Sequence, residues 1–152
     1  MLLSELLSAG RVKVPLGGRT KNEVFRELVD LVARTHDGVD ADAVLASVHE
    51  RERCLSTGIG GGIAIPHGRT PDLVELVLAA GVATGGIEYD AADGKPVRLV
   101  FMLVGPENAS GAHVKALSRI ARLLRQDRLR DELMRAPSAE AFLTLIRAAE
   151  AV

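Results

Sequence analysis

Tryptophan is absent from the 152-residue sequence, and aromatic side chains are limited to one tyrosine and three phenylalanines. Proteins that bind single-stranded nucleic acid stack bases on aromatic side chains, so this class is disfavoured. The formal net charge is -1, from 19 basic and 20 acidic side chains. No overall positive charge therefore attracts nucleic acid or an anionic membrane. We expect a protein with no nucleic-acid partner.

Cysteine occurs only at Cys54, which excludes an internal disulfide framework and favours a reducing compartment. The first residues contain no basic region, and Ser4 and Glu5 interrupt their apolar character, so they do not form a signal peptide. The longest apolar runs fall short of the ~20 residues that a membrane-spanning helix requires. The sequence predicts cytoplasmic localisation without direct membrane insertion.

The length and composition predict one domain covering residues 1–152, with 47% hydrophobic and 26% charged residues. Segments with strand and helix patterns alternate, which favours the α/β class, with helices flanking a small central β-sheet. Strands are expected at 11–16, 63–65, 74–82 and 97–104. Helices are expected to follow Thr20, Asp40 and Ser138 as N-caps, to begin at Ser110 or Gly111, and to cover 127–134. The glycine-rich segment 56–62 is expected to lack regular structure.

His67 is the first candidate for chemistry. It follows the short strand 63–65 and Pro66, and it precedes Gly68. Strand ends beside tight loops are where α/β sheets place ligands. The nearby glycines allow the backbone to approach a bulky group and to present amide donors. The alternative is an ordinary solvent-exposed turn histidine.

His113 and Arg51 are further candidates. His113 lies in the first turn of a helix, on its apolar side, where free N–H groups favour an anion. A buried-edge histidine bonded to a carbonyl is the structural alternative. Arg51 continues the buried side of the helix that starts after Asp40, and its guanidinium suits a carboxylate or phosphate. It could instead only complement the C-terminal end of the helix dipole.

Other arrangements fit poorly. The segment Gly58–Gly62 lacks the lysine of a P-loop and leads into a strand, so neither a P-loop nor a dinucleotide-binding loop is predicted. Cys54 is expected to be a packed small side chain. His67 and His113 could bind zinc as part of a hydrolase, but no third ligand is evident. We therefore predict no metal and no cofactor.

The segment RERCLSTGIGGGIAIPHG at residues 51–68 is more specific than its parts. It resembles the active-site signature of enzyme IIA domains of the bacterial phosphoenolpyruvate-dependent sugar phosphotransferase system, in the fructose/mannitol and nitrogen-regulatory class. Segments 86–90, 94–97 and 113–117 extend the resemblance over almost the whole chain. The resemblance implies the α/β class, in a single domain with a mixed central β-sheet flanked by helices. It also implies that His67 is the phosphorylated position, His113 the second active-site histidine and Arg51 the active-site arginine.

The resemblance also implies a phosphotransferase that works through a phosphohistidine. His67 would accept a phosphoryl group from the histidine-containing phosphocarrier protein and pass it to a IIB domain in sugar uptake. The alternative is a nitrogen-type regulatory IIA protein, whose phosphohistidine state controls binding to target proteins. The attacking atom would be Nε2. Thr57, Gly58, Gly60 and Gly68 are the loop residues expected to bind the phosphoryl oxygens.

Overall fold

The two longest strands, β5 (Val77–Ile87) and β6 (Val97–Gly105), form an antiparallel pair at the centre of a six-stranded sheet. This computed structural model describes residues 1–151. β1 (Val12–Lys13) pairs in parallel with β5, and β2 (Gly58–Gly60) pairs antiparallel with β3. β3 (Ile63–Ala64) and β4 (His67–Arg69) both lie parallel to β6. The predicted mixed sheet is confirmed.

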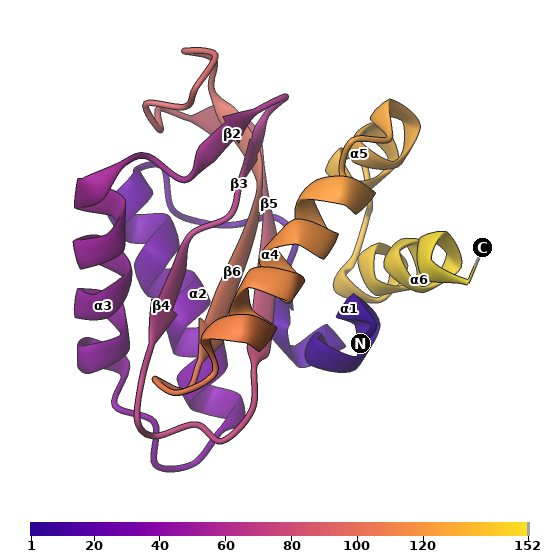
Figure 1. Cartoon of the computed structure of the whole chain (residues 1–152). Coiled ribbons are helices and arrows are strands. Elements are labelled where there is room, and N and C mark those ends of the chain that lie inside the picture. Colours follow the sequence, from indigo (N-terminus) through magenta and orange to yellow (C-terminus); the bar gives the residue numbers. More distant parts are fainter. Residues whose placement is uncertain (152) are drawn as a thin grey trace.

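Helices cover both faces of the sheet, as Figure 1 shows. They are α1 (Leu3–Leu6), α2 (Lys21–Thr35), α3 (Ala41–Cys54), α4 (Ser110–Leu123), α5 (Asp127–Met134) and α6 (Ala139–Glu150), with a short 3-10 helix at Ala9–Arg11. α2 and α3 pack on one face, and α1, α4, α5 and α6 pack on the other. Because both faces are covered, β6 reads as a nearly continuous apolar run.

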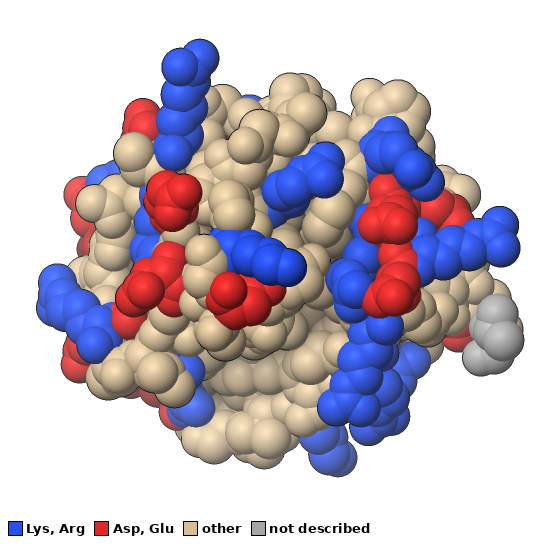
Figure 2. All heavy atoms as spheres, turned by 90° about the horizontal axis from the view of Figure 1, so that it is seen from above, with Lys and Arg blue, Asp and Glu red and all other residues tan. Residues whose placement is uncertain are grey.

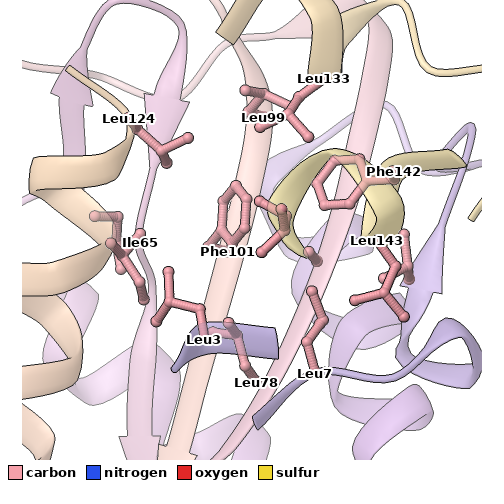
Figure 3. Packing of buried hydrophobic residues seen from close by; sticks show 14 of the residues in the cluster. Leu3, Leu7, Ile65, Leu78, Leu99, Phe101, Leu124, Leu133, Phe142 and Leu143 are labelled. Atoms are coloured by element: carbon pink, nitrogen blue, oxygen red, sulfur yellow. The ribbon is translucent and has the colours of Figure 1, made fainter. Parts of the chain in front are cut away.

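The core on the side of α4 to α6 is built around Phe101 of β6 and Phe142 of α6, whose ring centroids lie 5.7 Å apart (Figure 3). Leu3 of α1 is fully buried in this core. The carboxylate of Glu150 also fixes α1, because it accepts hydrogen bonds from the amides of Leu3 (2.7 Å) and Ser4 (2.9 Å). α1 and the last turn of α6 therefore lie side by side.

Side-chain caps begin three helices where the sequence predicts them. Thr20, Asp40 and Ser138 each accept a hydrogen bond from the backbone N–H three residues later. Such caps satisfy amides that have no partner within the helix. No helix within residues 1–151 is long and apolar enough to cross a membrane. Basic and acidic side chains are interspersed on the face seen from above (Figure 2).

Three strand predictions need correction. The strand expected at 11–16 is limited to Val12–Lys13, since Pro15 cannot donate a ladder hydrogen bond. The strand expected at 74–82 starts at Val77 and continues to Ile87. The segment expected to be irregular contains β2, which pairs with β3 through a bulge. α1 and β4 were not predicted, because each has too few residues to show a periodic pattern.

Candidate functional site

A cavity of about 460 Å³ lies between α3 and α4, with β4 at its base. Figure 1 shows β4 running between these two helices. The lining side chains come from all three elements: Ser47, Glu50, Arg51 and Cys54 from α3, His67, Gly68 and Arg69 from β4, and His113, Val114 and Leu117 from α4. The fold thus brings together the three residues with predicted chemical roles, His67, His113 and Arg51.

His67 begins β4 and is half-buried. Its Nδ1 lies 3.0 Å from the carbonyl oxygen of Ile65. A carbonyl can only accept, so Nδ1 carries the proton and Nε2 keeps its lone pair. Burial lowers the pKa of His67; the Ile65 carbonyl opposes this shift, Arg51 lowers the pKa further, and smaller effects come from Glu52 and Arg69. His67 is therefore a neutral imidazole at neutral pH, and the lone pair of its Nε2 is free.

His113 lies in the first turn of α4, and its ring packs edge-on against that of His67 with 5.2 Å between the centroids. It is 3% exposed, and neither ring nitrogen has a hydrogen-bond partner among the described residues. Burial lowers its pKa to about 4, and the nearby His67 and Arg69 add to the shift. A buried polar side chain without partners is costly, and a catalytic role, an ordered water or a bound ion can account for it.

Two guanidiniums line the cavity. Arg51 lies in the last turn of α3, where its Nη1 donates to the carbonyl oxygen of Leu55 at 2.8 Å. It therefore complements the helix end, as the structural alternative proposed, and also lines the cavity beside His67. Arg69 donates through Nη1 to the carbonyl oxygen of Glu107 and to the hydroxyl of Ser110. A hollow with two such cations and two neutral imidazoles suits an anionic group that carries several oxygens.

Comparison with known proteins decides the family. The sequence model of the family described as "Phosphoenolpyruvate-dependent sugar phosphotransferase system, EIIA 2" matches residues 5–149. The chain belongs to this family. The resemblance found in residues 51–68 thus extends over nearly the full length of this EIIA domain.

Relatives of this EIIA domain carry two kinds of name. A "PTS system fructose-specific EIIABC component" of Bacillus subtilis is 35% identical over 96% of the chain, which spans only 23% of that protein. A "Nitrogen regulatory protein" of Pseudomonas aeruginosa is 37% identical over 95% of the chain and 94% of that protein. The crystal structure of the IIA-Ntr protein of Neisseria meningitidis superposes with a TM-score of 0.88 at 33% identity, covering 95% of this chain and 98% of that one.

The loop residues expected to bind phosphate lie elsewhere in the EIIA domain, apart from Gly68. The hydroxyl of Thr57 is buried and contacts the carboxylate of Glu52 at 2.6 Å and the hydroxyl of Tyr89 at 2.7 Å. The amide of Thr57 also donates to Glu52, which in turn pairs with Lys21 at 2.9 Å. These contacts give Thr57 a structural role, and its predicted binding of phosphate stays a prediction.

The glycines have packing and turn roles. A Cβ at Gly68 would lie 2.9 Å from Cγ2 of Val48, so glycine lets α3 pack closely on β4. A Cβ at Gly58 would collide with Ala91 at 2.7 Å. Gly60 has a φ of +93°, which glycine adopts freely at the bulge between β2 and β3. Neither Gly58 nor Gly60 lines the cavity, so phosphate binding by these two also stays a prediction.

Sequence reasoning missed one charged residue of the cavity and misplaced another side chain. Arg69 stands two residues after His67, and the period-two alternation of β4 places both on one side, but this three-residue strand was not predicted. Cys54 was expected to be packed, but it is exposed and lines the cavity. Within residues 1–151 no three His, Cys, Asp or Glu side chains are grouped to hold a metal ion.

Proposed function

We propose that this EIIA domain is a phosphocarrier whose His67 accepts a phosphoryl group from the phosphohistidine of the histidine-containing phosphocarrier protein. The domain then passes the group to a IIB domain in sugar uptake. The observation that carries this proposal is the hydrogen bond between Nδ1 of His67 and the carbonyl of Ile65. It leaves Nε2 as the nucleophile, in a cavity that is also lined by Arg51 and His113.

The transfer forms one N–P bond and breaks another. The Nε2–P bond to His67 forms while the N–P bond of the donor histidine breaks, and the bonding electron pair stays on the donor nitrogen. Nδ1 of His67 keeps its proton and its bond to the Ile65 carbonyl, which supports the positive charge that the phosphorylated ring gains. Arg51 and His113 offer N–H donors to the equatorial oxygens of the transferred group, whose charge is spread in a loose transition state.

The proposal is tested by incubating the protein with phosphoenolpyruvate, enzyme I and the phosphocarrier protein, and then adding a IIB domain. We expect one acid-labile phosphoryl group per chain, which leaves the protein when the IIB domain is added. His36→Ala serves as the control and should still incorporate the phosphoryl group, because this histidine lies outside the cavity. Failure to incorporate phosphoryl from a cognate donor would contradict the proposal.

A regulatory output is the second candidate, and one observation favours it. The chain spans 94% and 95% of relatives named nitrogen regulatory proteins from Pseudomonas aeruginosa and Bradyrhizobium diazoefficiens. In that case His67 would be phosphorylated by the same route, and the phosphorylation state would control binding to target proteins. Addition of IIB domains to the phosphorylated protein separates the two outputs. A phosphoryl group that leaves the protein supports uptake, and one that stays on the protein supports regulation.

A further inference from the structure

Arg69 has a defined place beside the reacting histidine. It is the third residue of β4, which starts at His67, and both residues line the same cavity. Alternate residues of a strand project to the same side, so the backbone presents both side chains toward α4. The amide of Arg69 donates to the hydroxyl of Ser47 on α3 at 2.9 Å. This hydrogen bond holds β4 against α3 at the position of Arg69.

The guanidinium connects β4 to the beginning of α4. Its Nη1 donates to the carbonyl oxygen of Glu107 at 3.1 Å and to Oγ of Ser110 at 3.0 Å. Ser110 is the first residue of α4, and the preceding residue, Ala109, provides no side-chain cap. Arg69 therefore supplies the side-chain contact that fixes this helix start, one turn before His113.

The His113 ring depends on that helix start for its position. Its two nitrogens have no hydrogen-bond partner within residues 1–151, so only packing and the α4 backbone orient the ring. The backbone N–H of His113 donates to Ala109, in the turn that Arg69 holds. A shift of this turn would move His113 relative to His67. A misplacement of about 1 Å in a reacting site can cost about a hundredfold in rate.

We propose that Arg69 is a positioning residue for phosphoryl transfer, which holds the first turn of α4 against β4 and so sets the spacing of His113 and His67. Its effect on transfer rests on the function proposed above for His67. The guanidinium acts through the Glu107 carbonyl and the Ser110 hydroxyl.

The charge of Arg69 provides a readout that needs no phosphoryl donor. Arg69 lowers the pKa of His113 and, as the smallest contribution, that of His67. The other charged or titratable groups that act on this pair are Arg51 and Glu52 of α3, besides the two histidines themselves. Replacing Arg69 by a neutral side chain should therefore raise both pKa values, whereas lysine should keep them low.

α4 itself offers a matched control. Arg122 is an exposed cation of the same helix, and it lines a separate hollow with Lys115 and Arg119 rather than the His67 cavity. Arg122→Gln removes the same charge from the chain as Arg69→Gln. It leaves the start of α4 untouched.

The test measures single-turnover transfer from the phosphorylated phosphocarrier protein, together with histidine titrations by NMR, in five variants. They are Arg69→Gln, Arg69→Lys, Ser110→Ala, the Arg69→Gln/Ser110→Ala double variant and Arg122→Gln. Loss of the charged hydrogen bonds should slow Arg69→Gln by about tenfold or more, and loss of one acceptor should slow Ser110→Ala by about threefold. The double variant should be no slower than Arg69→Gln, because both substitutions break the same contact. Arg69→Lys should recover part of the rate.

Two results would overturn the inference about Arg69. One is an Arg69→Gln variant that transfers at the wild-type rate or is slowed no more than Arg122→Gln. The other is a pair of effects that multiply in the double variant, since Arg69 would then act independently of Ser110. A wild-type protein that accepts no phosphoryl group would instead contradict the function proposed for His67. The titrations would still test Arg69 in that case, and unchanged histidine pKa values in Arg69→Gln would count against it.

Discussion

Nδ1 of His67 lies 3.0 Å from the carbonyl oxygen of Ile65, two residues earlier in the chain. The intervening Pro66 has no backbone N–H and lies between β3, which ends at Ala64, and β4, which begins at His67. The chain therefore turns so that a backbone carbonyl contacts the ring that follows. This single contact selects the tautomer with a proton on Nδ1 and a lone pair on Nε2.

The tautomer can be observed directly. We expect ¹⁵N NMR of the free protein to show a protonated Nδ1 and an unprotonated Nε2 at His67. Because burial and Arg51 lower the pKa of His67, this neutral form should persist when the pH falls below 6.5, the ordinary value for histidine. A ring protonated on Nε2, or a titration midpoint at or above 6.5, would contradict this expectation.

The buried His113 should make stability depend on pH. Its pKa is about 4 in the folded protein and about 6.5 in an unfolded chain, so between these values the unfolded state binds more protons. The free energy of unfolding should therefore decrease as the pH falls from 6.5 toward 4, by up to about 3 kcal/mol for this residue.

Urea unfolding at pH 7.5 and pH 4.5 measures this dependence. His113→Leu removes the titrating group, so it should lose less stability between the two pH values than the wild-type protein. Part of the dependence will remain, because the pKa values of His67 and His49 are also lowered. An equal loss of stability in both proteins would show that His113 does not titrate in this way.

Substitution of Thr57 separates its structural role from its predicted role in phosphate binding. Thr57→Val removes the hydroxyl that contacts Glu52 and Tyr89 inside the domain. Buried acceptors left without a donor cost about 1–3 kcal/mol, so we expect a loss of that size in urea unfolding. Phosphoryl incorporation by the folded variant should be unchanged, and Thr57→Ser should restore most of the stability. A stable Thr57→Val protein that incorporates no phosphoryl group would instead support phosphate binding.

Gly68→Ala should destabilise the domain. A Cβ would lie 2.9 Å from Cγ2 of Val48 and 3.2 Å from its backbone nitrogen, so α3 would have to move away from β4. Overpacking of this kind costs about 1–3 kcal/mol. Gly85→Ala is the matched control, because nothing lies within 4 Å of a Cβ at that position. Equal midpoints of thermal unfolding for Gly68→Ala and Gly85→Ala would refute the packing role of Gly68.

The sequence predicted the layers of the fold because helix caps and apolar periodicity are local signals. Thr20, Asp40 and Ser138 cap the helices that they were expected to cap. Short elements carry no such signal. β4 has only three residues and is defined by pairing with β6, which comes about thirty residues later in the chain.

The candidate site was predictable to the extent that it depends on residue type and local context. His67, His113 and Arg51 were singled out from their places at a strand end, a helix start and a helix end, and the cavity brings them together. The partners of Thr57 could not be predicted, because Tyr89 lies 32 residues away in the sequence. Arg69 was missed because β4 itself was not predicted, and without the strand the alternation that places Arg69 beside His67 has no meaning.

Intact-protein mass spectrometry tests the central claim most directly. Wild-type protein and the His67→Ala variant would each be incubated with phosphoenolpyruvate, enzyme I and the phosphocarrier protein, after circular dichroism has shown that the variant is folded. The account predicts one acid-labile phosphoryl group on the wild-type chain and none on His67→Ala. Phosphoryl incorporation that persists in folded His67→Ala would contradict the assignment of His67 as the acceptor.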